Sequence, residues 1–161
     1  MSEKITIHYD NIPRCSSNLL YDIVIENTYE PLLDELMKFS IANKKLCIVT
    51  ETNVEAIYGK MLLDLLKPCA KEVILFSFPA GEENKNLQTV ERLYETLIIN
   101  RFERNDMLLA LGGGVVGDLT GFTAATYLRG IDFIQLPTSL LAQVDSSIGG
   151  KTGVDFNNFK N

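Results

Sequence analysis

A run of glycines is the part of this sequence best suited to bind a ligand. It reads Leu111-Gly112-Gly113-Gly114-Val115-Val116-Gly117-Asp118, between an apolar stretch typical of a strand and one typical of a helix. Three of these glycines fit the pattern G-x-G-x-x-G, in which backbone amides approach a diphosphate at the positive end of a helix. The run predicts a dinucleotide site, although tight packing of the helix on the strand would also call for glycines here.

Polar residues also follow two earlier apolar stretches. Glu51 and Asn53 come after the first, where a carboxylate could accept hydrogen bonds from both ribose hydroxyls and repel a 2′-phosphate, which favours NAD over NADP. The alternative is that this segment only begins a helix, capped by Thr52 or Asn53. After the second stretch comes Gly81-Glu82-Glu83-Asn84-Lys85, which is either a ligand-contacting loop or a solvated turn.

The last third of the chain places charged groups beside glycines. Asp145 follows Leu141 by four positions, so we expect it on a partly apolar helix face, where an idle carboxylate is costly. Lys151 leaves a glycine-rich turn and suits a phosphate or carboxylate ligand. A P-loop is excluded because Asp145 stands where its first glycine is required and the preceding segment predicts a helix.

Composition limits the classes of partner. The 161 residues carry a net charge of −6 with 46% hydrophobic residues, which fits one domain and argues against nucleic acid or a membrane surface as partners. No export signal is present, and the longest charge-free runs are too short to span a bilayer. Cys15, Cys47 and Cys69 are expected to be free buried thiols of a cytoplasmic protein, and with His8 they form no zinc-binding spacing.

The elements that must position these residues alternate between strand and helix. Apolar runs predict strands over 45–50, 72–78, 107–111 and 133–136, and helical stripes follow over 54–66, 87–98 and about 114–127. A further helix should begin after Pro137, capped by Thr138 or Ser139. Upstream we expect short strands near 5–9 and 23–26 and a helix over 32–37. The pattern predicts an α/β, Rossmann-like parallel sheet with helices on both faces, with ligands at the carboxyl ends of the strands.

Longer stretches of the sequence resemble the 3-dehydroquinate synthase family. The resemblance rests on Gly112–Phe122, Tyr127–Gly130 and Gln135–Gly153, with Glu51–Val54 and Gly81–Lys85 similar to the adenosine-side motifs of that family. It spans the whole chain but covers only about the first half of the family's length. It implies a shikimate-pathway carbon–oxygen lyase, which converts 3-deoxy-D-arabino-heptulosonate 7-phosphate to 3-dehydroquinate and phosphate with NAD and a divalent metal, zinc or cobalt.

The resemblance also implies a role for individual residues. Those expected to bind NAD are Glu51, Asn53, Glu82, Lys85, Gly113, Gly114, Val115, Asp118, Thr138 and Ser139. Those expected near the substrate and nicotinamide are Asp145, Lys151, Lys160 and Asn161. Arg129 is expected to contact the substrate phosphate across the interface of a homodimer.

The sequence departs from the family pattern at three places. Ser139 stands where Thr is common, and Glu51 stands where Asp is common, so the hydroxyl and the charge are kept. The segment Asp155-Phe156-Asn157-Asn158-Phe159-Lys160-Asn161 replaces the commoner Asn-His-Pro-x-Gly-Lys-Asn. The positions of Lys160 and Asn161 therefore depend on spacing and on the final Lys-Asn pair.

The family's metal ligands, one glutamate and two histidines, belong to a helical C-terminal domain. We therefore expect residues 1–161 to be an N-terminal nucleotide-binding domain, with 146–161 leading into that second domain, and expect the chain alone to bind NAD weakly and to be inactive. The alternatives are the same domain of another sugar-phosphate cyclase, that of a polyol or iron-type alcohol dehydrogenase, and a stand-alone binding module.

Overall fold

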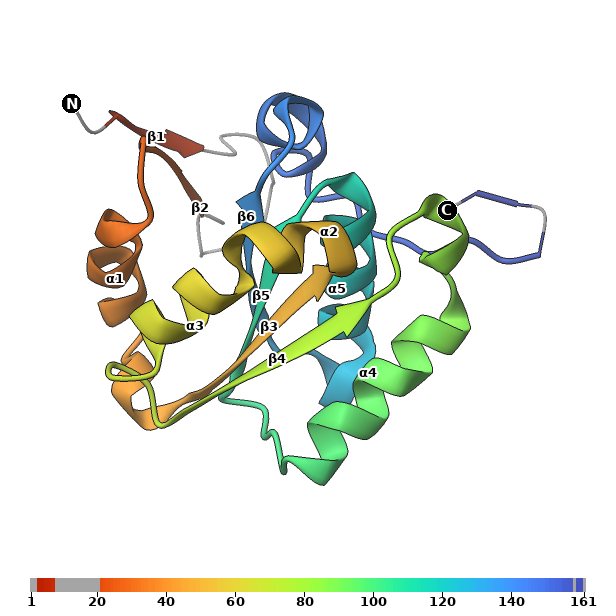
Figure 1. The fold of residues 1–161 in the computed structure, drawn as a ribbon, viewed down its shortest axis with the longest axis horizontal. Coiled ribbons are helices and arrows are strands. Elements are labelled where there is room, and N and C mark those ends of the chain that lie inside the picture. The colour runs from red at the N-terminus through yellow and green to blue at the C-terminus, as the bar shows by residue number, and fades with distance from the viewer. Residues whose placement is uncertain (1–2, 8–20, 158, 161) are drawn as a thin grey trace, which may run out of the picture.

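A four-stranded parallel sheet lies at the centre of the computed structural model, which describes residues 3–7, 21–157 and 159–160 (Figure 1). Its strands are β3 (Lys45–Glu51), β4 (Glu72–Phe78), β5 (Met107–Gly112) and β6 (Asp132–Pro137), in the order β4-β3-β5-β6. Every residue of β5 is buried, as expected for an inner strand of a sheet covered on both faces. The predicted strands and their parallel arrangement are confirmed.

Helices cover both faces of this sheet. The helices α1 (Glu30–Met37) and α3 (Lys60–Leu66) contribute Leu36, Leu62 and Leu66 to the core on one face. The helices α4 (Leu87–Ile99) and α5 (Gly114–Thr126) form the core on the other face, with side chains such as Leu93 and Leu119. Apolar residues spaced three and four apart place these side chains on one side of each helix.

The short elements differ most from the sequence-based expectations. The helix expected over 54–66 is divided into α2 (Thr52–Val54), a π-helical turn (Glu55–Gly59) and α3. Ser139 caps the segment after β6 as expected, since its Oγ accepts from the Ala142 N–H at 3.3 Å, but only a π-helical turn follows (Ala142–Ser146). The described residues also form three 3₁₀ turns: Ile41–Asn43, Glu82–Asn84 and Tyr127–Arg129.

The two upstream strands pair with each other and not with the main sheet. They are β1 (Glu3–Ile7) and β2 (Tyr21–Ile25), and they run antiparallel. The expected limits of these strands were shifted towards the C-terminus by one or two residues, and residues 8 and 9 lie outside the described chain. Tyr21 Oη donates a hydrogen bond to the Ile148 carbonyl at 2.5 Å, which ties this pair to the segment after β6.

The order of the strands creates a place where the connections diverge. The chain leaves β3 through α2 and α3 to reach β4 on one side, whereas it leaves β5 through α5 to reach β6 on the other. The helices that follow β3 and β5 lie on opposite faces of the sheet, so the carboxyl ends of these two strands form a switch point from which two loops diverge (Figure 1). Ligands of doubly wound sheets bind at this kind of switch point.

The free thiols differ in burial, which leads to a labelling prediction. Cys47 is fully buried in β3, and desolvation raises the pKa of its thiol to about 12, whereas Cys69 is only partly buried. Because the thiolate is the reactive form, we expect a maleimide at pH 8 to modify Cys69 well before Cys47. Peptide mapping by mass spectrometry measures both rates. Equal rates in the native protein would contradict the burial of Cys47, and equal rates in denaturant are the control. Cys15 and His8 lie outside the described residues.

Candidate functional site

The candidate site lies at the carboxyl ends of three adjacent strands. Glu51 ends β3, Gly112 ends β5 and Pro137 ends β6. The Thr138 N–H donates to the Gly112 carbonyl at 3.0 Å, so the loop after β6 is held against the loop after β5. The sequence motifs that suggested ligand binding therefore meet at one edge of the sheet, as the parallel arrangement predicts.

Glu51 has a structural role as well as a predicted ligand role. One carboxylate oxygen accepts from the Asn53 N–H and the other from the Val54 N–H, both at 2.9 Å, so Glu51 itself caps α2. The expected caps were wrong: the Thr52 hydroxyl accepts from the Ala80 N–H, and the Asn53 side chain is exposed. Each carboxylate oxygen keeps a second lone pair, so capping leaves Glu51 able to accept from ribose hydroxyls.

The first turn of α5 has the features of an anion cradle. No side chain caps this helix, and a Cβ placed on Gly113 or Gly114 would come near only two hydroxyls, those of Ser139 (3.4 Å) and Ser146 (3.3 Å). The Ser146 Oγ is buried and has no hydrogen-bond partner among the described residues. An uncapped helix start beside an unsatisfied hydroxyl fits a ligand oxygen such as that of a diphosphate.

Other glycines of the same motif are required for packing. A Cβ on Gly112 would lie 2.5 Å from Val116 Cγ2, and one on Gly117 would lie 2.5 Å from Gln135 Oε1. Gly121, one turn further along α5, would meet Thr152 Cγ2 at 2.1 Å. The packing interpretation of the glycine run is therefore confirmed for Gly112 and Gly117, and the dinucleotide interpretation stays a prediction for Gly113 and Gly114.

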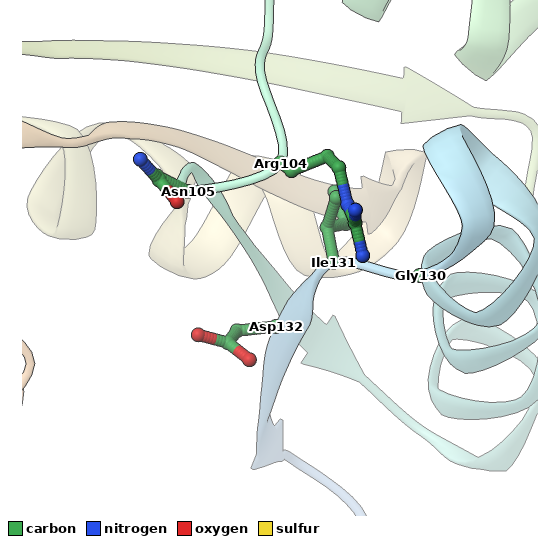
Figure 2. Close-up of a pocket in the computed structure, with 5 residues that line it drawn as sticks. All are labelled: Arg104, Asn105, Gly130, Ile131 and Asp132. Carbon is green, nitrogen blue, oxygen red and sulfur yellow. The ribbon is translucent and has the colours of Figure 1, made fainter.

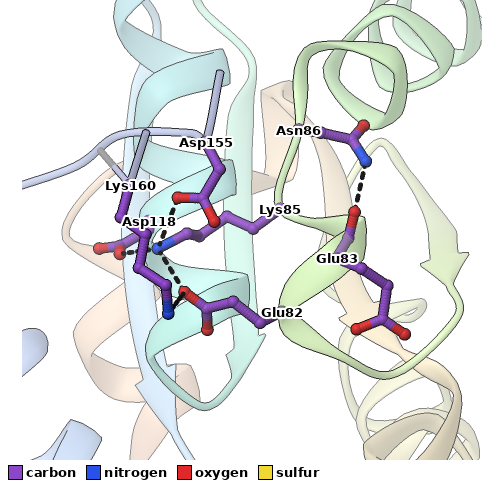
Figure 3. Close-up of polar contacts among 7 residues, drawn as sticks. All are labelled: Glu82, Glu83, Lys85, Asn86, Asp118, Asp155 and Lys160. Carbon is purple, nitrogen blue, oxygen red and sulfur yellow. Dashed lines mark hydrogen bonds and ion pairs between the residues drawn. The ribbon is translucent and has the colours of Figure 1, made fainter. Parts of the chain in front are cut away.

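A buried lysine forms the charged part of the site (Figure 3). The Lys85 ammonium, whose side chain is 4% exposed, lies 3.1 Å from Glu82 Oε1, 3.4 Å from Asp118 Oδ2 and 3.5 Å from Asp155 Oδ1. Burial alone would lower the pKa of Lys85, but these carboxylates outweigh it and hold the pKa above its usual value. Burial raises the pKa of Asp118, although the nearby Lys85 opposes that shift.

Two members of this site were missed by the sequence-based prediction. Asp155 was noted only as a departure from the family pattern, and Ser146 only as part of a polar run. The single sequence signal for Asp155 is an acidic residue directly after the Gly153-Val154 pair. Nothing local distinguishes Ser146 from Ser147, because its burial depends on α5, which lies elsewhere in the sequence.

The residues expected near the substrate lie along the segment after β6. Asp145 is exposed, as are its apolar neighbours Leu141 and Val144, so the expectation of a costly carboxylate on an apolar face was wrong. Lys151 is also exposed. Lys160 reaches Glu82 Oε1 at 3.5 Å, which brings it to the Lys85 cluster. Asn161 lies outside the described residues.

Arg129 lies near the amino ends of the strands, whereas these groups lie near the carboxyl ends. It precedes the amino end of β6 and has a left-handed backbone, with φ 71°. Beside it is a surface pocket of about 440 Å³, lined by Arg104, Asn105, Gly130, Ile131 and Asp132 (Figure 2). The structure therefore does not bring Arg129 together with the other predicted residues of the same chain.

Two negative findings concern the described part of the chain. Its His, Cys, Asp and Glu side chains form no group of three that could hold a metal ion. Within the same residues, no helix is both long enough and apolar enough to cross a bilayer.

Comparisons with known proteins agree with the motifs. The family model for the 3-dehydroquinate synthase N-terminal region matches residues 75–161. The chain is 46% identical to the 3-dehydroquinate synthase of Streptococcus suis (strain 05ZYH33) over 152 residues, which are 94% of this chain and 41% of that protein. The chain thus spans about two fifths of the length of the curated relatives it matches.

Solved structures of related enzymes have the same fold. A 2-deoxy-scyllo-inosose synthase complexed with carbaglucose-6-phosphate, NAD+ and Co2+ matches with a TM-score of 0.73 and 28% identity, over 81% of this chain and 36% of that one. A 2-epi-5-epi-valiolone synthase from Streptomyces hygroscopicus subsp. jinggangensis 5008, with NAD+ and Zn2+ bound, matches with a TM-score of 0.70 and 30% identity, over the same shares. These matches confirm the Rossmann-like fold and the resemblance drawn from the motifs.

Proposed function

This chain belongs to the 3-dehydroquinate synthase family, and on that basis we propose that residues 1–161 are a nucleotide-binding domain that holds NAD at the carboxyl ends of β3 and β5. The observation that carries the proposal is the start of α5. There, the helix has no side-chain cap, a Cβ on Gly113 or Gly114 would meet a serine side chain at 3.4 or 3.3 Å, and the Ser146 hydroxyl has no hydrogen-bond partner among the described residues. The N-terminus of a helix with glycines of this kind suits a diphosphate.

The proposal gives each predicted NAD residue a role. Glu51 and Asn53 would contact the adenosine ribose at the end of β3. Gly113, Gly114, Val115 and Asp118 would line the diphosphate, with Thr138 and Ser139 beside it, and Glu82 and Lys85 would contact the nucleotide further along. When bound, NAD supplies a reversible hydride acceptor, and the residues of this chain orient it and exclude water.

The substrate is proposed to be a sugar phosphate, 3-deoxy-D-arabino-heptulosonate 7-phosphate, which the whole protein converts to 3-dehydroquinate and phosphate. Asp145, Lys151, Lys160 and Asn161 lie in or follow the segment after β6, and the lysines would attract the anionic groups of the substrate. Arg129 precedes the amino end of β6, whereas this segment follows its carboxyl end, which supports a role of Arg129 at the site of a partner subunit in a homodimer.

The divalent metal of the proposed enzyme, zinc or cobalt, finds no ligand set among the described residues. The family resemblance assigns this metal to one glutamate and two histidines of a helical C-terminal domain. As a biosynthetic enzyme with free cysteines, the protein is proposed to work in the cytoplasm.

Binding of NAD by this chain is the direct test. Calorimetric titration should give a weak Kd, in the range of about 0.1–1 mM, because a single nucleotide-binding domain leaves one side of the cofactor open to water. Titration with ATP is the control for nonspecific binding of a nucleotide. No heat and no thermal shift at millimolar NAD would contradict the proposal.

Replacing Glu51 tests the orientation of the cofactor. Glu51→Gln removes the negative charge that faces the ribose, so we expect the preference for NAD over NADP to fall by about tenfold. The ratio of the two dissociation constants is the measurement, since any loss of the α2 cap affects both ligands equally. An unchanged ratio would show that the ribose lies elsewhere.

The alternatives within the fold class have less support. The chain is 46% identical to a 3-dehydroquinate synthase but 28–30% identical to the two other cyclases. A protein that contains this chain together with its metal site should release phosphate from 3-deoxy-D-arabino-heptulosonate 7-phosphate. Release from glucose 6-phosphate would instead favour the 2-deoxy-scyllo-inosose synthase activity, and net formation of NADH would favour an alcohol dehydrogenase.

A further inference from the structure

Lys85 joins three segments that are far apart in the sequence. Glu82 belongs to the loop between β4 and α4, Asp118 to α5, and Asp155 to the segment that follows the π-helical turn (Figure 3). Their carboxylates surround one ammonium at 3.1–3.5 Å. An ammonium that is almost fully buried needs such partners, because its desolvation is costly when it is unpaired.

The three carboxylates are not equivalent as anchors. Glu82 has a side chain that is 44% exposed, and it also pairs with Lys160, so water and a second cation compete for it. Asp118 and Asp155 are 20% and 19% exposed, so their pairs with Lys85 are screened less. A flexible lysine side chain is held in one direction best when two well-buried partners contact it. Asp118 on α5 is one of them, and Asp155 is the other.

Asp155 also holds Lys85 through the backbone. The Asp155 N–H donates to the Lys85 carbonyl at 2.8 Å, and residues 86 and 155 form a parallel bridge. The side chain and the main chain of Asp155 therefore contact the two ends of the same lysine. This backbone tie does not depend on the side chain, so replacing the carboxylate should leave the two segments paired.

The segment that contains Asp155 is held at a second point. Thr152 packs against Gly121 of α5, where no side chain larger than that of glycine fits. Lys151 lies directly before this contact, and Asp155 lies three residues after it. The segment is thus fixed to α5 at one point and to the loop before α4 at the other.

We propose that Asp155 is a positioning residue of the cofactor site: its side-chain oxygen holds the Lys85 ammonium beside α5, while its N–H ties the 151–157 segment to the loop before α4. This inference depends on the proposed function, in which Lys85 contacts the nucleotide. The family pattern noted above has Asn at this position, which also offers an oxygen acceptor. We therefore expect an oxygen acceptor, charged or neutral, to be sufficient for this positioning.

Three variants of the 161-residue chain test this assignment. Asp155→Ala removes the acceptor, and we expect the affinity for NAD to fall by about fivefold to tenfold. Asp155→Asn keeps an oxygen in place, and it should restore the affinity to within about twofold of the wild type. Asp64→Ala is the matched control, because Asp64 pairs with Lys60 on an exposed helix surface and should leave the affinity unchanged.

A second readout observes Lys85 itself. In NMR spectra, the Lys85 ammonium protons should exchange slowly in the wild type and in Asp155→Asn, and quickly in Asp155→Ala. A change in overall stability alone would not produce this pattern, and thermal melting of each variant measures that change separately. Wild-type affinity in Asp155→Ala, or equal weakness of Asp155→Ala and Asp155→Asn, would overturn the assignment.

The same measurements separate the two proposals. If the wild type binds no NAD, the proposed function fails, and the ammonium exchange alone then decides on Asp155. If the wild type binds NAD and all three variants bind it equally, the proposed function stands and the positioning role is overturned.

Discussion

Lys85→Met is expected to lower the free energy of unfolding by about 3–4 kcal/mol, which is a loss typical of removing one partner from a buried ion pair. Methionine is unbranched and one heavy atom shorter than lysine, so the variant removes the charge and leaves no large cavity. Glu82, Asp118 and Asp155 then lose the cation that they share, while Glu82 keeps its pair with Lys160. For a chain of this size, the melting temperature should fall by about 10 °C.

The pH dependence of this loss has a definite sign. In the wild type the pKa of Lys85 is raised, so its stabilising contribution is complete below pH 10.5 and is lost as the pH rises above that value. In the variant, the cation that opposes the raised pKa of Asp118 is gone, so the cost is present at neutral pH and is relieved as the pH falls towards 4. The difference between the two proteins should therefore be largest between about pH 6 and pH 10.

Denaturant titrations of both proteins at pH 4, 7 and 9 measure this difference. Lys60→Met is the matched control, because Lys60 forms an exposed pair with Asp64 and its loss should leave the free energy of unfolding nearly unchanged. Adding Asp118→Asn to Lys85→Met should recover part of the lost stability at pH 7. A Lys85→Met variant as stable as the wild type at all three pH values would contradict the buried cluster.

Gly114→Val is expected to weaken NAD binding by at least about tenfold while leaving the chain folded. A Cβ at this position would lie 3.3 Å from the Ser146 Oγ, which is tight but can be accommodated by a small shift of the serine. The rest of the valine side chain would occupy the space over the first turn of α5, where the diphosphate is proposed to bind. The position lies at the start of the helix, so the cost in stability should stay near 1 kcal/mol.

Calorimetric titration with NAD and thermal melting together test this variant. Ala125→Val is the control, because it places the same side chain at an exposed position near the other end of α5 and should bind NAD as the wild type does. Gly121→Val is the opposite case: a Cβ there would lie 2.1 Å from Thr152 Cγ2 and 2.9 Å from Thr152 Cβ, so this variant should unfold more readily than the wild type. NAD binding by Gly114→Val at wild-type strength would move the diphosphate away from α5.

Local patterns were enough to predict the sheet and the motifs. The strand β5 is a continuous apolar run, and such runs are typical of parallel strands buried on both faces. The glycine run and the polar residues after the strands were placed correctly at one edge, because parallel strands bring their carboxyl ends together. The short elements were harder to predict, since the division of the helix after β3 into three pieces leaves the apolar spacing almost unchanged.

The roles of single side chains depended on distant neighbours. Glu51 was expected to leave capping to Thr52 or Asn53, but its longer side chain turns back to accept from two N–H groups. Asp145 was expected to be costly, but no other element covers its face in the described structure. Both outcomes depend on chain geometry and burial, which apolar spacing alone does not specify.

The sequence by itself determined the alternation of strands and helices and the family, because these follow from local patterns of apolar residues and from the motifs. Only the tertiary structure decided which glycines serve packing, because Gln135 and Thr152 approach α5 from elsewhere in the chain. It likewise placed Arg129 near the amino ends of the strands and assembled Glu82, Asp118 and Asp155 around Lys85. Such a cluster depends on long-range contacts between segments, whose distances no local pattern encodes.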